Sequence, residues 1–258
     1  MDKALLIKSV SKSISVLQAI NRHGSMSITN IARHGNLPYP TAFRIVQTLM
    51  HEGLIEQDPL RKHYRPTALV DSLAHGYRAE SRIVDIAREP MSAFTREMGW
   101  PMFISVRVGT KMVVRHATHG ETSLTFDLCY PGFTVPLLTS ATGYALLAHL
   151  GDEDVRRATD WYRRAYPDAV ELDEVLLHRK LAQVRAQGHA AKPCSSDTRS
   201  SSVAVPVLLA DGRAEAVLTL TYFSAAMNEQ TAIERYAPRL KQAARQIALN
   251  VEDAAYAC

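Results

Sequence analysis

The sequence predicts a mixed α/β (α+β) protein with a small winged helix-turn-helix domain first and a larger α/β domain after it. Two observations predict this fold class. Residues 37–56 are typical of a short helix that begins after two prolines and ends at a glycine, preceded by two further helical segments. From residue 100 onwards, strand-like apolar runs alternate with amphipathic helical segments. A chain of 258 residues is long enough for two domains with cores of their own.

The first two helices are predicted from apolar periodicity. One stripe recurs at helical spacing and is expected to be buried: Val10, Ile14, Leu17, Ala19 and Ile20. His23 and Gly24 end this helix, and a second helix is expected over residues 29–34, burying Ile31 and Ala32. The tight turn at 35–37 then leads into the stretch described above, so the three helices form a helix-turn-helix core.

The third helix is predicted to have an apolar back and a polar front. Proline is tolerated in the first turn of a helix, which places its start near Tyr39. The predicted apolar stripe is Phe43, Val46, Leu49 and Met50. The residues that fall off this stripe are Arg44, Gln47, Thr48 and His51. Gly53 ends the helix, and a front of this kind suits the major groove of DNA.

A two-stranded wing is expected after this helix. A strand starts at Leu54, a turn spans residues 58–62, and Tyr64 opens the returning strand. Arg61 and Lys62 lie at the tip of the turn, and Arg65 follows, so these cations could meet phosphates or the minor groove. The alternative for each of these cations is an exposed side chain that contacts only solvent.

The rest of the chain divides into a connector and a second domain. We expect domain boundaries at 1–66, 67–80 and 81–258, with a linker helix to about Arg78 and a helix over 81–98. The expected strands are 100–108, 112–119, 123–128, 203–210 and 213–223. The expected helices are 144–149, 152–164, 172–187 and 228–251. Residues 131–143 are predicted as a loop entering a helix, and residues 192–202 as a polar, mobile loop.

Composition narrows the function classes. Residues 1–80 hold ten Lys and Arg against six Asp and Glu, so the net charge of +4 lies wholly in this part, as expected if it meets a polyanion. No apolar run approaches the ~20 residues that span a bilayer, and the first residues are too mixed for a signal peptide. Three cysteines far apart fit free thiols in a reducing cytoplasm. We expect no membrane association, cofactor or metal.

The sequence resembles the IclR family of bacterial transcriptional regulators along nearly its whole length. The motifs that carry the resemblance are SVSKSISVL from Ser9, the segment 37–54 with Tyr64, VPLLTSATGYALLA from Val135 and VAVPV from Val203. Three further stretches look like the branch that controls the degradation of aromatic acids: WP from Trp100, MVVRHATH from Met112 and RYAPRL from Arg235.

This resemblance implies a GAF-like effector-binding domain after the winged helix-turn-helix. The residues expected to contact DNA are Lys12, Tyr39, Thr41, Arg44, Gln47, Arg61 and Lys62. The residues expected to bind the effector are Phe126, Leu137, Ala141, Thr142, Ser202, Thr219 and Thr221. Backbone N–H groups at a helix start favour a carboxylate, and strand hydroxyls orient a polar ligand, although Ser and Thr on strands often reflect β-propensity alone.

The expected partners follow from the same resemblance. A homodimer or dimer of dimers binds a double-stranded DNA operator, because one recognition helix reads only a half-site. A small aromatic carboxylate is the expected effector. Activation of a catabolic operon, with RNA polymerase as a further partner, is the expected outcome.

The sequence departs from the family pattern at several positions. Lys12 stands where Arg is usual, which keeps the charge and loses the bidentate fork. Pro40 replaces a small or hydroxyl residue, so one hydroxyl contact to DNA is missing. Leu138, Tyr144 and Ser202 stand where His, Lys and Cys are common, and all three bear on the identity of the effector.

Two alternative functions remain open at this point. One is an enzyme acting on an aromatic acid with an appended helix-turn-helix, although the sequence has no G-x-S-x-G, H-E-x-x-H, P-loop or G-x-G-x-x-G motif. His116 and His119 have no third ligand at a spacing that suits a metal. The other alternative is a constitutive DNA-binding dimer whose second domain only oligomerises.

Overall fold

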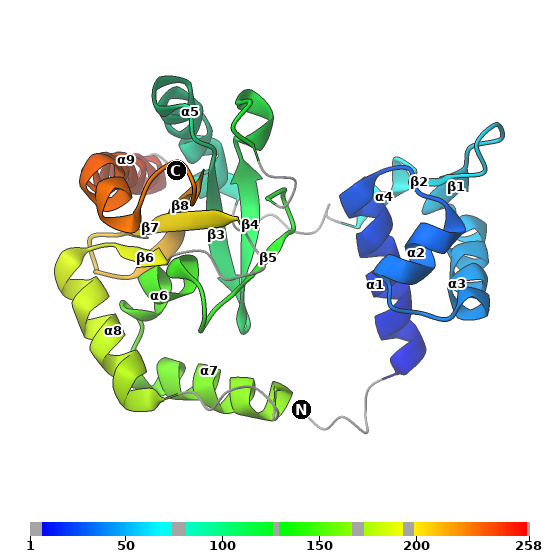
Figure 1. Ribbon diagram of the computed structural model, residues 1–258, viewed down its shortest axis with the longest axis horizontal. Coiled ribbons are helices and arrows are strands. Elements are labelled where there is room, and N and C mark those ends of the chain that lie inside the picture. Colours follow the sequence, from blue (N-terminus) through cyan, green and yellow to red (C-terminus); the bar gives the residue numbers. More distant parts are fainter. Residues whose placement is uncertain (1–6, 74–80, 126–128, 167–172, 193–198, 257–258) are drawn as a thin grey trace. The chain divides into compact units, whose positions relative to one another are not determined.

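The computed structural model describes residues 7–73, 81–125, 129–166, 173–192 and 199–256 (Figure 1). Contacts between residues divide the chain into two compact units, Met1–Ala79 and Glu80–Cys258. Each unit has its own apolar core, as expected for a chain of this length.

The first unit is a helix-turn-helix followed by a two-stranded wing. Its elements are α1 (Lys8–His23), α2 (Ile28–His34), α3 (Tyr39–His51), β1 (Ile55–Gln57), β2 (Tyr64–Pro66) and α4 (Leu69–Ser72). The three long helices enclose a core that includes Val16, Ile20, Ile31, Val46 and Leu49. β1 and β2 pair antiparallel, with Glu56 opposite Arg65. The predicted winged helix-turn-helix is therefore confirmed.

The local chemistry explains where these helices begin and end. The Ser27 side chain accepts a hydrogen bond from the Asn30 amide at 3.3 Å and so caps α2. α3 begins directly after Pro38, with Pro40 in its first turn. Gly53 follows the end of α3 with φ of 72°, a left-handed conformation that side chains other than glycine rarely adopt.

The predicted apolar stripes of α1 and α3 are partly wrong. Val10 and Ile14 are each 51% exposed, because α2 and α3 cover only the C-terminal half of α1, where Val16 is buried. On α3, Phe43 is 42% exposed and Ala42 takes the buried position. At this turn of α3, the buried position is therefore residue 42 and not residue 43 as predicted.

The second unit is built on a six-stranded antiparallel sheet with the strand order β5-β4-β3-β8-β7-β6. Its strands are β3 (Met102–Val108), β4 (Lys111–Ala117), β5 (Thr134–Pro136), β6 (Ala190–Lys192), β7 (Ser200–Leu208) and β8 (Ala214–Phe223). Its helices are α5 (Ser81–Met98), the 3-10 helix η2 (His119–Glu121), α6 (Ala141–Leu147), α7 (Asp152–Ala165), α8 (Glu174–Gln187) and α9 (Glu229–Tyr256). The expected mixture of helices and sheet is confirmed.

The sheet carries a helical layer on each face (Figure 1). α5 and α9 cover one face, where Ile104 and Leu218 belong to the same core as Tyr236 of α9. α6 and α8 cover the other face, where Val217 packs in a second core with Leu146. Neighbouring residues such as Val217 and Leu218 thus face opposite layers, in keeping with the alternation of a strand.

The predictions for residues 123–128 and 131–143 are wrong. The third strand was expected over 123–128, but residues 123–125 are not strand and 126–128 lie outside the described residues. The strand beside β4 is instead β5, in the segment expected to be a loop. β5 lies at the edge of the sheet, where its Pro136 costs no ladder hydrogen bond.

The polar stretch 192–202 was expected to be a loop, yet both of its ends are strand. Lys192 ends β6, and Ser202 in β7 pairs with Lys192 on one side and Thr221 on the other. Residues 193–198 lie outside the described residues. Within the described residues, the expected linker helix corresponds to the short helix α4. Residues 74–80, which were expected to continue it, lie outside the described residues.

Candidate functional site

The front of α3 carries a continuous set of exposed side chains. Tyr39, Arg44 and Gln47 are exposed, and Thr41 is half-buried at the first turn. Their positions follow from the buried face, because Ala42, Val46 and Leu49 point into the core and leave the opposite face of the helix uncovered. The front therefore offers hydrogen-bonding groups of the kinds that read base edges.

A hollow of about 420 Å³ lies between α1 and α3, which we call the α1–α3 hollow. Its lining residues are Ser9, Lys12, Ser13, Thr41, Arg44, Ile45 and Thr48. Lys12 of α1 and Arg44 of α3 thus share one concave surface with the Thr41 hydroxyl. Two cations and a hydroxyl in one concavity form a chemically suitable seat for a phosphate oxygen.

The wing tip presents two more cations. The Asp58 carboxylate accepts hydrogen bonds from the backbone amides of Leu60 and Arg61 at 2.8 and 3.0 Å. These two bonds lower the pKa of Asp58 and fix the turn. Arg61 and Lys62 are exposed at this turn and do not line the α1–α3 hollow. Arg65 instead pairs with Glu56 across the wing, with 2.7 Å between Nε and Oε1.

Sequence reasoning placed Phe43 in the core, but it lies on the front of α3. Its ring stacks on that of Tyr39, with 6.4 Å between centroids and 10° between planes. The rings lie one helical turn apart, which is the spacing at which such side chains meet. The small residue next to it, Ala42, was the signal that could have indicated this position of Phe43.

The second unit contains a pocket of about 430 Å³ beside the first turn of α6, which we call the α6 pocket. Its lining residues are Phe103, Cys129, Phe133, Val135, Pro136, Thr139, Ser140, Ala141, Thr142, Lys192, Ser200, Ser201, Ser202 and Thr221. Aromatic and aliphatic side chains supply one part of this surface, and hydroxyl groups supply another. This combination is typical of a site that holds and orients a small ligand.

Three hydrogen bonds, one of them buried, connect the first turn of α6 to its neighbours beside the α6 pocket. The hydroxyls of Thr142 on α6 and Thr219 on β8 lie 2.9 Å apart, and both side chains are buried. The Ser140 hydroxyl accepts a bond from the Gly143 amide at 2.9 Å and donates to the Pro136 carbonyl at 2.5 Å. α6 is thereby fixed to the sheet and to the β5 segment.

The strand side of the α6 pocket brings Lys192, Ser202 and Thr221 together. These three residues follow one another across β6, β7 and β8 in register. The Thr221 hydroxyl is buried and has no hydrogen-bond partner among the described residues. The Lys192 ammonium donates to the Thr139 carbonyl, and burial lowers its pKa. An unpaired buried hydroxyl and a half-buried cation in one pocket favour an anionic ligand.

Comparison with known families decides what kind of protein this geometry belongs to. The family model described as the bacterial transcriptional regulator IclR C-terminal domain matches residues 75–249. The model described as the IclR helix-turn-helix domain matches residues 9–59. The chain belongs to the IclR family. It is a DNA-binding transcriptional regulator with a C-terminal ligand-binding domain, and it is not an enzyme.

Individual IclR-family relatives support this assignment over the whole chain. The regulator XynR of Escherichia coli is 24% identical over 242 residues, which are 92% of this chain and 94% of XynR. The IclR regulator of Alicyclobacillus acidocaldarius has the same fold, with a TM-score of 0.69 at 21% identity over 95% of this chain and 99% of that one. An IclR homologue of Microbacterium hydrocarbonoxydans complexed with 4-hydroxybenzoate matches with a TM-score of 0.68 at 20% identity, over 95% and 99% of the two chains.

The residues expected to bind an effector in this IclR chain are only partly brought together. Ala141, Thr142, Ser202 and Thr221 line the α6 pocket. Thr219 lies behind Thr142 and supports it without lining the pocket. Leu137 lines a different pocket on the far side of the β5 segment. Phe126 lies outside the described residues.

Sequence reasoning missed Lys192 as the cation of the α6 pocket. Four other basic side chains of the same domain do not line the pocket: Arg107, Arg115, His116 and His119. Arg107 pairs with Asp154 at 3.4 Å. The signal that could have identified Lys192 is its place at the end of the apolar pair Ala190 and Ala191, which is typical of a strand leaving a core.

Within the described ranges, no three His, Cys, Asp or Glu side chains come together in a group that could hold a metal ion. Among the helices of the described part, none is both long and apolar enough to cross a membrane.

Proposed function

We propose that this IclR-family regulator binds a small aromatic carboxylate in the α6 pocket and thereby controls a catabolic operon. The observation that carries the proposal is that the Lys192 ammonium and the Thr221 hydroxyl, which has no hydrogen-bond partner among the described residues, line the same pocket. A carboxylate satisfies both groups at once, because it accepts hydrogen bonds on two oxygens.

The rest of the α6 pocket suits the aromatic ring of such a ligand. Phe103, Phe133, Val135 and Pro136 supply apolar surface across from the hydroxyls. Aromatic pairs in this setting contribute about 0.5–1.5 kcal/mol beyond their buried area. The solved IclR homologue with bound 4-hydroxybenzoate supports this choice of ligand class, since it shares the fold of this chain.

DNA binding is proposed to use the front of α3, the α1–α3 hollow and the wing tip. Tyr39, Thr41, Arg44 and Gln47 would face base edges, while Lys12, Arg61 and Lys62 would contact phosphates. Arg44 stands at the centre of this surface, because it lies on α3 and also lines the hollow. A homodimer or a dimer of dimers would present two such surfaces to the half-sites of an operator.

The sign of regulation is proposed to be activation. The support is the resemblance of the segments that start at Trp100, Met112 and Arg235 to regulators of aromatic-acid degradation. By linkage, a ligand that prefers one arrangement of the protein changes DNA affinity or the engagement of RNA polymerase by its differential binding energy.

A thermal-shift screen tests the ligand class. The purified protein is heated with benzoates, hydroxybenzoates, phthalates and phenylpropionates. A ligand at 100 times its dissociation constant should add ~2.7 kcal/mol of stability. Thr221→Val should remove most of the shift, while the exposed Thr231→Val on α9 should keep it. If no compound shifts the melting temperature, the aromatic carboxylate is wrong and a constitutive DNA-binding dimer becomes the better account.

A further inference from the structure

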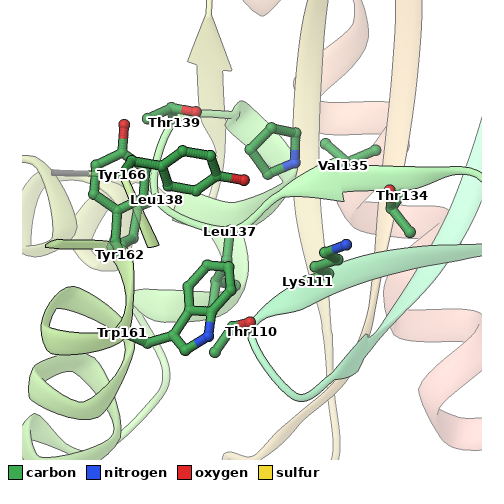
Figure 2. A pocket seen from close by; sticks show the side chains of 11 residues that line it. Thr110, Lys111, Thr134, Val135, Leu137, Leu138, Thr139, Trp161, Tyr162 and Tyr166 are labelled. Carbon is green, nitrogen blue, oxygen red and sulfur yellow. The ribbon is translucent and has the colours of Figure 1, made fainter. Parts of the chain in front are cut away.

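A second pocket of about 360 Å³ lies on the other side of the β5 segment from the α6 pocket. We call it the α7 pocket, because Trp161, Tyr162 and Tyr166 from α7 and its C-terminal end form one wall (Figure 2). Thr110 and Lys111, from the hairpin between β3 and β4, stand across from that wall (Figure 2). Nothing in the proposed function uses these residues.

The aromatic wall is assembled as a cage. The Tyr166 ring lies 6.0 Å from that of Trp161 at 82°, and 5.1 Å from that of Tyr162 at 44°. These centroid distances and tilted planes are those of favourable aromatic pairs. Leu137 and Leu138, each 3% exposed, lie in the lining and join it to the core.

Ion pairs connect both ends of α7 to neighbouring elements. Arg107 of β3 pairs with Asp154 in the first turn of α7 at 3.4 Å, and it also donates to the Gly109 carbonyl at 2.9 Å. Arg163 in the last turn of α7 pairs with Glu174 of α8 at 2.7 Å. The helix that bears the aromatic rings is thus tied to the hairpin that bears Lys111.

The chemistry of the α7 pocket differs from that of a plain surface hollow. Three aromatic side chains line the pocket and supply apolar surface for a flat aromatic group, and Lys111 in the same lining supplies a cation for an anion. Within the described residues, no acidic side chain lines the pocket. We propose that the α7 pocket is a second ligand site of this regulator, which takes a flat aromatic acid with its ring in the aromatic cage and its acid group at Lys111.

The two pockets share part of their lining. Val135, Pro136 and Thr139 belong to both the α6 pocket and the α7 pocket. A ligand in the α7 pocket therefore contacts the same segment that a ligand in the α6 pocket contacts. Lys111, Trp161 and Tyr162 line only the α7 pocket, so substitutions there test this second site independently of the proposed effector site.

Trp161 provides a direct reporter for this site. The chain has two tryptophans, so Trp100→Phe leaves Trp161 as the only indole. Trp100 is 7% exposed in the core under β8, and it lies outside both pockets. The full-length Trp100→Phe protein is titrated with 2-naphthoate, a flat aromatic acid, and the emission of Trp161 is followed.

We expect saturable quenching of the Trp161 emission. In the same background, Lys111→Glu and Tyr162→Ala should each weaken 2-naphthoate binding at least tenfold. Arg156→Glu, an equal change of charge on the exposed side of α7, should leave it within twofold. Circular dichroism melting of each variant verifies that it is folded.

Three outcomes would overturn the proposal. Quenching that does not saturate would show that 2-naphthoate has no site near Trp161. Equal weakening by Lys111→Glu and Arg156→Glu would show that only the net charge matters. Binding that is lost in Thr221→Val and kept in Lys111→Glu would place the probe in the α6 pocket and would leave the proposed function untouched.

Discussion

At the scale of single residues, His119 ties the stability of the second unit to pH. It is 9% exposed, its ring nitrogens have no hydrogen-bond partner among the described residues, and burial lowers its pKa to about 4. The unfolded chain therefore binds a proton at His119 below pH ~6.5 that the folded chain does not bind until about pH 4. Stability conferred by the neutral ring is present above pH ~6.5 and is lost as pH falls towards 4.

We predict that this residue makes the free energy of unfolding fall by about 3 kcal/mol between pH 7 and pH 4. Urea denaturation at several pH values measures the effect. Because Gln is not protonated in this range, the free energy of unfolding of His119→Gln should fall by about 3 kcal/mol less between pH 7 and pH 4. Parallel pH profiles of the two proteins would contradict the assignment.

Arg44 is predicted to be the main base-reading residue. Its replacement by Ala removes a bidentate donor worth about 1–3 kcal/mol, so specific DNA binding should weaken by about 5- to 150-fold. Fluorescence anisotropy with operator and scrambled DNA measures both affinities. Arg96→Ala, an exposed arginine in the second unit, is the control and should change neither. Unchanged discrimination in Arg44→Ala would remove it from the readout.

Cys129 is predicted to be unreactive in the folded protein, although it lines the α6 pocket. Burial raises its pKa to about 12, so little thiolate exists at pH 8. Alkylation by iodoacetamide should be slower than in the unfolded chain by about 10²–10³-fold. Mass spectrometry of a Cys194→Ser, Cys258→Ser variant isolates this thiol. Equal rates in the folded and urea-unfolded protein would contradict the burial argument.

The sequence could predict some members of the site and not others. Thr142 and Thr221 were expected because the resemblance to the IclR family implies ligand contacts at these positions, and both line the α6 pocket. Lys192 could not be found from its type, because a lysine near polar residues is usually solvated. Its position after the apolar pair Ala190 and Ala191 indicates a strand end, and the pairing of β6 with β7 then places it beside Ser202.

At the scale of elements, the first turn of α6 depends on one glycine. A Cβ at Gly143 would lie 1.8 Å from the Leu137 carbonyl oxygen, which is backbone and cannot turn aside. The seven-residue helix α6 approaches the β5 segment this closely because residue 143 has no side chain. Ser140, Ala141 and Thr142, which directly precede Gly143, line the α6 pocket.

Gly143→Ala is therefore predicted to destabilise the second unit by about 1–3 kcal/mol or more, as overpacking does. Gly151→Ala is the matched control, because a Cβ there meets nothing within 4 Å and its φ of −69° suits alanine. Thermal melting compares the two variants. A Gly143→Ala protein as stable as Gly151→Ala would show that the contact is not tight.

The elements that could be predicted are those with a strong periodic signal or clear end signals. The strongly amphipathic helices α5 and α7 lie within one or two residues of their predicted bounds, and so does α8, whose ends are marked by Asp173 and Gly188. β5 was missed because three residues at a sheet edge, one of them proline, carry no alternation. The start of β7 was missed because its serines face a pocket, so their polarity was mistaken for solvent exposure.

At the scale of the whole molecule, the two units divide the work of a regulator. The surplus of positive charge lies in residues 1–80, which contain the helix-turn-helix and the wing. The second unit carries both pockets on its sheet and helices. The sequence could predict this division from charge and periodicity, but the existence of two pockets depends on strand pairings that no local pattern specifies.

A ligand bound in the second unit is proposed to change how the first unit binds DNA. The most direct test is the operator dissociation constant, measured by anisotropy on DNA from upstream of its own gene, with and without the aromatic acid that gives the largest thermal shift. We expect the ligand to change this constant by about 5- to 150-fold, and we expect Thr221→Val to remove the change. An unchanged dissociation constant, with the protein saturated by ligand, would contradict it.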